Sequence, residues 1–258
     1  MRRPPGLPDG YELVMVGSAL VAVEAEALEV VVAALETAGT LYGYAASLPD
    51  PIRLQGRGVV YGIDAPGGRW VVRRYRRGGL VARWLGDRYL RVGLPRPIRE
   101  LIASAAARRR GVATPRVIAA AVYPAGIFYR ADVITEYIPD SIDLAEALFG
   151  PAALEGEDRV RACAAAGRLV AGLAGRGVAH PDLNLKNILL VRSGGGVSAV
   201  LLDLDRCRIQ DRLSDGQGAR MRRRLLRSVE KWEARTGRRL TPRERSALDP
   251  AEGGDAVG

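Results

Sequence analysis

His180-Pro-Asp-Leu-Asn-Leu-Lys-Asn187 is the most informative stretch of this sequence, and Asp203-Leu-Asp205 begins sixteen residues after Asn187. An Asp, an Asn five positions later, a strand hairpin and a second Asp form an arrangement that suits phosphoryl transfer. That reaction needs positioning and charge neutralisation more than covalent chemistry from the protein. One carboxylate orients the attacking hydroxyl and accepts its proton, while amide and carboxylate oxygens hold Mg²⁺, a cation that prefers oxygen ligands.

The segments around this stretch predict the elements that carry it. Residues 188–191 and 199–202 are short apolar strands joined by Ser193-Gly-Gly-Gly196, which is a hairpin signal. The hairpin is expected to return Asn187 and Asp203 to one edge of a small sheet. Residues 159–176 before the stretch have the composition and spacing of a helix, with Cys163 on its apolar side.

The rest of the chain reads as strands first and helices later. Residues 20–37 are expected to form a helix from their Ala, Leu and Glu content, and residues 221–235 a basic amphipathic helix. Strands are expected at 59–63 and 70–74, joined by a Pro-Gly-Gly turn, and at 117–122 and 133–137. A helix should begin at Pro97 and end at Gly111. This order predicts an α+β protein with two lobes.

Composition limits the class of protein. The chain has 258 residues, of which 48% are hydrophobic, so it can bury a sizeable core and is not disordered. Cys163 and Cys207 fit no disulfide or metal framework, which suits a reducing compartment. The apolar run near the N-terminus contains glutamates, so no membrane span is expected, and Asp9 and Glu12 argue against a signal peptide. A cytoplasmic protein is expected.

The net charge of +10 is concentrated in two segments. Residues 69–99 contain ten arginines and one acid, and residues 206–245 contain fourteen basic residues and five acids. Such segments indicate an anionic partner: phosphate groups, an anionic membrane surface or nucleic acid. Solvated faces in an arginine-rich chain are the plainer interpretation. Nucleic acid is disfavoured, because aromatic residues make up only 5% of the chain and base-stacking platforms need them.

The pattern His180-x-Asp182-Leu-x-x-x-Asn187 resembles the catalytic loop of protein-kinase-like enzymes, and Asp203-Leu-Asp205 stands where they have Asp-Phe-Gly. More narrowly, the chain resembles the lipopolysaccharide kinases that phosphorylate the inner-core sugar 3-deoxy-D-manno-octulosonic acid (Kdo). The matching segments lie within about residues 54–210 and are Gly56-Arg-Gly58, Val71-Val-Arg-Arg-Tyr-Arg-Arg-Gly-Gly-Leu80, Gly86-Asp-Arg-Tyr-Leu90, Arg99-Glu100, Phe128-Tyr-Arg-Ala-Asp132, Asp182-Leu-Asn184 and Asp203-Leu-Asp-Arg206.

The resemblance implies a two-lobed protein-kinase-like fold, with a small β-rich ATP-binding lobe over residues 1–137 and a mostly helical catalytic lobe over residues 138–258. It also implies a role for individual residues. Asp182 would be the catalytic base, Asn187 and Asp203 the Mg²⁺ ligands, and Gly56 and Gly58 part of a loop over the ATP phosphates. The segment Glu136-Tyr-Ile138 would be the hinge whose backbone holds adenine.

The sequence also departs from the kinase pattern. The strand that carries a phosphate-binding lysine in kinases has Arg73 here, and a guanidinium can also bind phosphate oxygens. Glu100 would pair with Arg73 by the family pattern, although helical periodicity points Glu100 toward solvent. His180 is expected to brace the loop. Pro181 and the absence of a later Ala-Pro-Glu argue against a protein substrate.

The predicted function is therefore ATP- and Mg²⁺-dependent phosphorylation of a Kdo hydroxyl on a lipid A precursor. The enzyme would act as a peripheral protein at the cytoplasmic face of the inner membrane, where its basic segments would meet an anionic, lipid-linked sugar acceptor. Arg74, Arg76 and Arg77 are expected to line the acceptor side. Two alternatives remain: a kinase of a protein or a soluble sugar, and an inactive basic module that binds membranes or RNA. The sequence indicates no particular oligomeric state.

Overall fold

The computed structural model describes residues 3–49, 51–54, 59–76, 86–194 and 196–249. The chain divides into two compact units. Unit 1 comprises residues 1–105 and 115–137, and unit 2 comprises residues 106–114 and 138–258. Residues 106–114, which the sequence assigned to the first lobe, thus group with the second. Helices and strands are mixed, so the predicted α+β class is confirmed.

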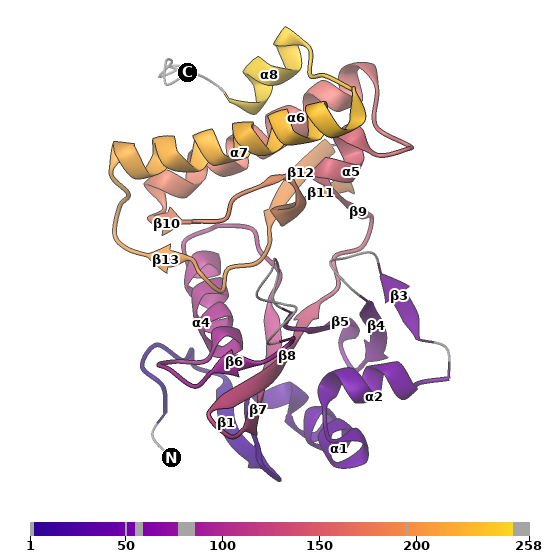
Figure 1. The fold of residues 1–258 in the computed structure, drawn as a ribbon, viewed down its shortest axis with the longest axis vertical. Helices are drawn as coiled ribbons and strands as arrows, with labels where there is room; N and C mark the ends of the chain where they lie inside the picture. Colours follow the sequence, from indigo (N-terminus) through magenta and orange to yellow (C-terminus); the bar gives the residue numbers. More distant parts are fainter. Residues whose placement is uncertain (1–2, 50, 55–58, 77–85, 195, 250–258) are drawn as a thin grey trace. The chain divides into compact units, whose positions relative to one another are not determined.

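Unit 1 is built on one antiparallel sheet (Figure 1). Its strands lie in the order β1 (Tyr11–Val16), β2 (Ala19–Glu24), β7 (Val117–Ala125), β8 (Phe128–Glu136), β5 (Gly68–Arg74), β4 (Val60–Ala65) and β3 (Ile52–Leu54), and β6 (Tyr89–Leu90) pairs with β8. The central strands β7 and β8 carry side chains that are buried on both faces. The hairpin predicted between residues 63 and 70 joins β4 to β5.

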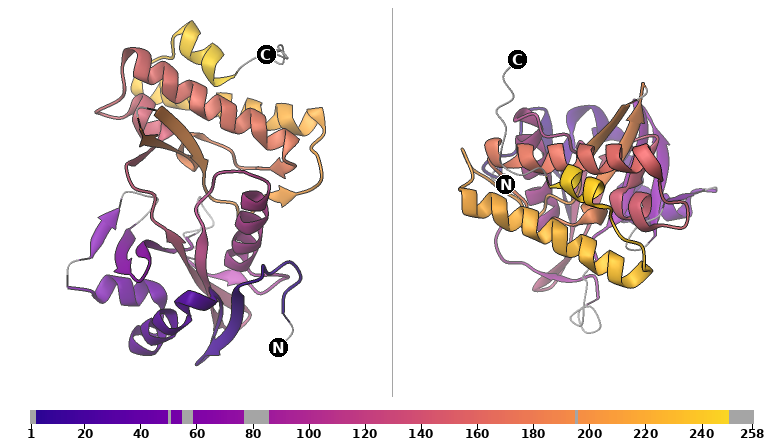
Figure 2. Two further views of the ribbon diagram at one scale, coloured as in Figure 1. Left: turned by 180° about the vertical axis from the view of Figure 1, so that it is seen from behind. Right: turned by 90° about the horizontal axis from the view of Figure 1, so that it is seen from above.

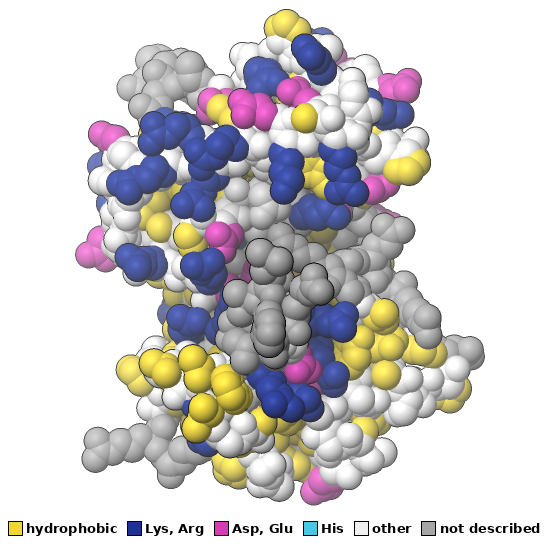
Figure 3. All heavy atoms as spheres, viewed as in Figure 1, with side chains coloured by type: hydrophobic (Ala, Val, Ile, Leu, Met, Phe, Trp, Pro, Cys, Tyr) yellow, Lys and Arg dark blue, Asp and Glu magenta, His cyan; other side chains and the backbone are white. Residues whose placement is uncertain are grey.

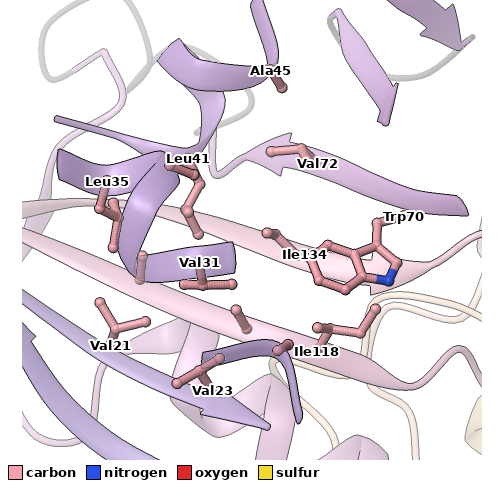
Figure 4. Packing of buried hydrophobic residues seen from close by; sticks show 14 of the residues in the cluster. Val21, Val23, Val31, Leu35, Leu41, Ala45, Trp70, Val72, Ile118 and Ile134 are labelled. Atoms are coloured by element: carbon pink, nitrogen blue, oxygen red, sulfur yellow. The ribbon is translucent and has the colours of Figure 1, made fainter. Parts of the chain in front are cut away.

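Helices cover both faces of this sheet (Figures 1 and 2). A 3-10 turn η1 (Ala25–Ala27), α1 (Leu28–Ala38) and α2 (Leu41–Ser47) pack on one face, where Val31, Leu35 and Leu41 meet sheet residues such as Ile134 and Trp70 (Figure 4). Helix α4 (Arg96–Arg109) packs on the other face through Ile98 and Leu101. Two apolar layers therefore hold the sheet of unit 1 between them.

The single helix predicted over residues 20–37 is wrong. Residues 19–24 form strand β2, and a helix begins only at Leu28. Val21 and Val23 pack on the α1 face of the sheet while Ala22, between them, packs on the α4 face. A strand that is buried on both faces is a continuous apolar run, and periodicity cannot separate such a run from a buried helix. Within the described residues, no helix is both long enough and apolar enough to cross a bilayer.

Unit 2 is mostly helical, with α5 (Leu144–Phe149), α6 (Gly156–Gly175), α7 (Asp215–Thr236) and α8 (Pro242–Leu248). Helices α6 and α7 run side by side, as the view from above in Figure 2 shows. Its strands form a three-stranded sheet of β12 (Gly196–Leu201), β11 (Ile188–Ser193) and β9 (Ser141–Asp143), and a pair of β10 (Val178–Ala179) and β13 (Arg208–Ile209). A 3-10 turn, η2 (Leu185–Asn187), precedes β11.

Helix α8 has no counterpart in the sequence prediction, although its N-terminus carries a capping box between Thr241 and Glu244. Glu244 is buried and pairs with Arg159 of α6, with 3.2 Å between the Nε and Oε1 atoms. Gly167 permits close contact between the helices, because a Cβ there would lie 2.5 Å from the carbonyl oxygen of Ala247. Cys163 of α6 is fully buried, as predicted, and burial raises its pKa to about 12.

Candidate active site

The loop from His180 to Asn187 leads from β10 through η2 into β11. The carbonyl oxygen of Asp182 accepts hydrogen bonds from the side-chain amides of Asn184 at 2.7 Å and Asn187 at 3.1 Å. The Asn184 side chain in turn accepts a bond from the backbone N–H of Lys186 at 3.0 Å. Side-chain amides thus bond part of the backbone of this loop and help to hold its shape.

His180 is held inside unit 2. Its side chain is buried, and its Nε2 donates to the carbonyl oxygen of Leu202 at 3.0 Å. Its backbone N–H points at the sulfur of Met221 at 3.2 Å. Burial lowers the pKa of the imidazole, since a buried cation loses its hydration. A neutral, buried imidazole bonded to the segment before Asp203 supports the bracing role that was expected, rather than a role as general base.

The β11–β12 hairpin brings the two predicted metal ligands together. Ile188 pairs with Leu201 at the base of the hairpin, and the N–H of Leu202 donates to the carbonyl oxygen of Asn187 at 2.8 Å. Asp203 follows Leu202 directly. The prediction that the hairpin returns Asn187 and Asp203 to one edge of the small sheet is therefore confirmed. Asp203 has a backbone φ of +60°, which is uncommon for a residue other than glycine and recurs at functional sites.

The donor set suits Mg²⁺ bound together with a nucleotide. Among the described residues, no three or more His, Cys, Asp or Glu side chains are grouped to hold a metal ion. The predicted ligands are instead the carboxylate of Asp203, after the hairpin, and the amide of Asn187, whose nitrogen is bonded to the Asp182 carbonyl and whose oxygen is the hard donor. Mg²⁺ in proteins is commonly held by one or two such groups and completed by phosphate oxygens and water.

The carboxylate of Asp182 lies between two arginines of unit 2. Its Oδ2 is 2.8 Å from Nη1 of Arg206, and its Oδ1 is 3.9 Å from Nη1 of Arg224 in α7. Asp182 is 45% exposed, whereas neighbouring Leu183 is buried. The carboxylate is therefore open to solvent on a loop whose backbone is fixed, which is the arrangement that a proton acceptor for an incoming hydroxyl requires.

In unit 1, Arg73 at the end of β5 forms the predicted ion pair with Glu100 of α4. The hydroxyl of Tyr75 donates to the other oxygen of the same carboxylate. The Arg73 guanidinium also lies 5.1 Å from the centre of the Tyr75 ring. The Glu100 carboxylate and the Tyr75 ring thus hold the Arg73 cation at the strand end, and its role as a substitute for the kinase lysine stays a prediction.

Glu100 shows where helical periodicity is misleading. Its side chain is buried although the spacing of α4 pointed it toward solvent. Ser104, one turn later on the same face, is also buried and donates to the carbonyl oxygen of Pro115 at 2.8 Å. A buried carboxylate is tolerated when charged and polar groups satisfy it, and the strand end supplies both Arg73 and Tyr75.

The other predicted residues have varied surroundings. The side chain of Glu136 accepts a hydrogen bond from the backbone N–H of Arg116 at 2.8 Å. The carbonyl oxygen of Ile138 accepts one from the hydroxyl of Ser141 at 2.7 Å. Backbone contact of this segment with adenine stays a prediction. Gly56, Gly58 and Arg77 lie outside the described residues.

Arg74 and Arg76, both expected on the acceptor side, differ in their contacts. Arg76 is exposed. Arg74 pairs with the fully buried Asp132 at 3.4 Å and lies 4.5 Å from the centre of the Tyr42 ring. Burial raises the pKa of Asp132, and the Arg74 guanidinium opposes that rise. These contacts tie Arg74 into the interior of unit 1, and its contact with an acceptor stays a prediction.

Three residues that contact predicted site residues within their own units had no role in the sequence analysis. Tyr75 hydrogen-bonds Glu100, and Arg206 and Arg224 flank Asp182. Arg206 is part of a segment that carries the family resemblance, which was a signal that could have identified it. Arg224 is one of many arginines in α7, and nothing in its spacing distinguishes it.

Comparisons with known proteins identify the family of the chain. Residues 52–248 match the family described as "Lipopolysaccharide kinase (Kdo/WaaP) family". The chain is 38% identical over 164 residues to a 3-deoxy-D-manno-octulosonic acid kinase of Xanthomonas oryzae pv. oryzae (strain PXO99A), covering 60% of each chain. It is 37% identical over 159 residues to the enzyme of that name from Stenotrophomonas maltophilia (strain K279a), again covering 60% of each. The chain thus spans about 60% of the length of these relatives.

Among solved structures, the chain is similar to one titled "WaaP in complex with acyl carrier protein". The TM-score is 0.49 at 17% identity, and the alignment covers 79% of this chain and 77% of the other.

Proposed function

Because the chain belongs to the lipopolysaccharide kinase (Kdo/WaaP) family, we propose that it transfers the γ-phosphoryl group of ATP to a hydroxyl of Kdo on a lipid A precursor. The observation that carries the proposal is the loop of unit 2, in which Asn187 is bonded to the backbone of Asp182 and the hairpin returns Asp203 beside Asn187. A relative that is 38% identical to the chain over 164 residues bears the name of this activity.

Each group of the loop has a chemical role in the proposed reaction. The sugar hydroxyl oxygen forms a bond to the γ-phosphorus while the bond from that phosphorus to the ADP oxygen breaks, and Asp182 accepts the hydroxyl proton. Asn187 and Asp203 would hold Mg²⁺, which when bound neutralises charge on the phosphates. The exposed carboxylate and the fixed backbone of the loop support this assignment.

The nucleotide side of the proposal rests on unit 1. Arg73 would bind phosphate oxygens, and its pairing with Glu100 supports that role, because the pair fixes the guanidinium at the strand end. Glu136 and Ile138 would belong to the segment that binds adenine, and Gly56 and Gly58 to the loop over the phosphates. Arg74, Arg76 and Arg77 remain candidates for contact with the acceptor.

A row of exposed cations on α7 supports the proposal that the protein binds an anionic inner-membrane surface. We name as the α7 stripe the exposed cations Arg220, Arg227, Lys231 and Arg235, which the spacing of the helix puts on one side. Figure 3 shows Lys and Arg side chains gathered over the part of the molecule where Figure 1 draws α7. Each cation near an anionic bilayer contributes about 1 kcal/mol of binding free energy, so the four cations together would contribute appreciably to membrane binding. The protein would then work as a peripheral protein at the cytoplasmic face of the membrane.

Vesicle sedimentation tests the membrane part of the proposal. The double variant Arg227→Gln/Lys231→Gln should bind anionic vesicles more weakly than the wild type, and wild-type binding should fall with salt. Arg161→Gln/Arg168→Gln in α6 removes the same charge from another exposed surface and is the matched control. Equal losses in both double variants would refute a role for the α7 stripe.

The acceptor is tested by incubating the protein with labelled ATP and a panel: a Kdo-bearing lipid A precursor, a general protein substrate, a soluble aminoglycoside and RNA. Mass analysis of the products should show one added phosphate on the Kdo-bearing acceptor. Transfer to protein or aminoglycoside would identify a kinase of another acceptor. Binding of RNA or vesicles without phosphate transfer would identify an inactive basic module. The Asp182→Asn variant controls for contaminating kinases.

A further inference from the structure

One face of α7 lies along the loop that contains Asp182. Four of its residues, each three or four positions after the last, contact successive loop residues. Met221 contacts the His180 N–H at 3.2 Å, Arg224 contacts Asp182 at 3.9 Å, Ser228 accepts from the Leu185 N–H at 3.3 Å, and the Trp232 ring lies 5.4 Å from Lys186 Nζ. The side chain of Arg224 is therefore carried on a helix that is fixed to the loop both before and after it.

Arg206 approaches the same carboxylate from another segment. It follows Leu204 and Asp205, both buried, and its Nη1 is 2.8 Å from Asp182 Oδ2. Two cations thus share the Asp182 carboxylate. The Arg206 and Arg224 side chains are 59% and 45% exposed, so water and other anions can compete for both of them.

The arginines are not needed to hold the loop. The carbonyl oxygen of Asp182 is already bonded by Asn184 and Asn187, and Leu183 and Leu185, which follow Asp182, are buried. A hydroxyl that gives its proton to Asp182 must come within about 2.6–3.2 Å of the carboxylate. The sugar ring that bears this hydroxyl then contacts the groups that surround the Asp182 carboxylate. These include the guanidinium groups of Arg206 and Arg224.

We propose that Arg206 and Arg224 bind a carboxylate that the acceptor sugar carries close to its reacting hydroxyl. The acceptor carboxylate replaces one of their contacts with Asp182 and leaves an Asp182 oxygen for the hydroxyl proton. Guanidinium groups donate hydrogen bonds only and match carboxylate geometry, so a sugar acid is preferred over a neutral sugar. This inference rests on the proposed function, in which the acceptor is a sugar acid, and assigns the residues that recognise its acid group.

The test compares two soluble acceptors, a Kdo glycoside and the same glycoside with its carboxylate converted to a carboxamide. The wild type should have the lower KM for the carboxylate form. Arg206→Gln and Arg224→Gln should each raise that KM about tenfold, the usual size of one lost charge-assisted hydrogen bond, and should change the KM for the carboxamide and for ATP little. Arg223→Gln removes a charge from another side of α7 and should leave all three values unchanged.

Two results would overturn the inference. Equal losses with both acceptors would mean that the arginines only position Asp182, and a change confined to the KM for ATP would assign them to the nucleotide. A wild type that phosphorylates neither acceptor would count against the proposed function. In that case calorimetric titration with the two glycosides decides the inference separately: tighter binding of the carboxylate form that depends on Arg206 and Arg224 upholds it, and equal binding refutes it.

Discussion

Glu100 of α4 is paired with Arg73 at the end of β5, and its carboxylate is buried although the arginine is partly open to solvent. Tyr75 bonds the second oxygen of that carboxylate, so both oxygens are satisfied within unit 1. The pair links a helix on one face of the sheet to the strand that faces it. Its geometry is fixed by packing, which is what a phosphate-binding cation needs.

Glu100→Ala is expected to reduce both stability and nucleotide affinity. The change leaves the partly exposed Arg73 guanidinium and the Tyr75 hydroxyl without the carboxylate, and loss of a hydrogen bond to a charged group costs about 1.5–3 kcal/mol. Urea unfolding and the KM for ATP measure the two effects. Glu36→Ala removes an exposed glutamate of α1 and should change neither. A variant at position 100 with wild-type stability and ATP affinity would contradict the role of the pair.

Asp182→Asn is expected to lower turnover by at least ~10² while ATP binding is retained, because a positioned base contributes about that much. The amide keeps the shape of the side chain and removes its ability to accept a proton. Steady-state kinetics measure the turnover, and nucleotide titration measures the affinity for ATP. Asp211→Asn, a change at an exposed aspartate of unit 2, is the control. Near-normal turnover would show that another group accepts the proton.

Asp203→Asn should weaken the binding of Mg²⁺–ATP and leave the binding of metal-free ATP almost unchanged. Asparagine tolerates the positive φ of this position, so the backbone should keep its conformation. Asp140→Asn is a matched control, since Asp140 also has a positive φ, of 50°. Calorimetry with and without Mg²⁺ separates the two affinities. An unchanged magnesium dependence would remove Asp203 from the set of ligands.

Stability should fall as the pH drops below about 6.5, the ordinary pKa of histidine. His180 is the only histidine, and its burial lowers its pKa in the folded protein. Between the folded and unfolded pKa values the unfolded chain binds more protons, so the free energy of unfolding decreases with falling pH. Urea unfolding from about pH 7.5 to 5 should show this slope in the wild type and a shallower slope in His180→Gln. Equal slopes would mean that other groups cause the loss.

Much of the candidate site could be predicted from local sequence. The residues that hold the loop are close together in the chain: Asn184 and Asn187 bond Asp182 from two and five positions away. The hairpin that returns Asp203 is likewise encoded by two apolar strands and a glycine turn. Spacing in the sequence predicts such contacts well, because residues a few positions apart can adopt few backbone conformations that place them far from each other.

Contacts between distant segments could not be read in this way. Residues 20–37 were predicted as one helix because a strand buried on both faces has no alternation, and only the packing of α1 and α4 on opposite faces of the sheet shows which residues belong to the strand. The burial of Glu100 depends on Arg73 and Tyr75, more than twenty residues earlier.

The amino-acid sequence by itself determined the chemical groups of the loop and their order, since backbone geometry over a few residues leaves little choice. The tertiary structure decided which of many arginines lies beside Asp182. Arg224 is 42 positions away in the chain, and only the packing of α7 along the loop brings its guanidinium to the carboxylate. Burial and charge pairing are set by neighbours in space, and a linear pattern does not contain those neighbours.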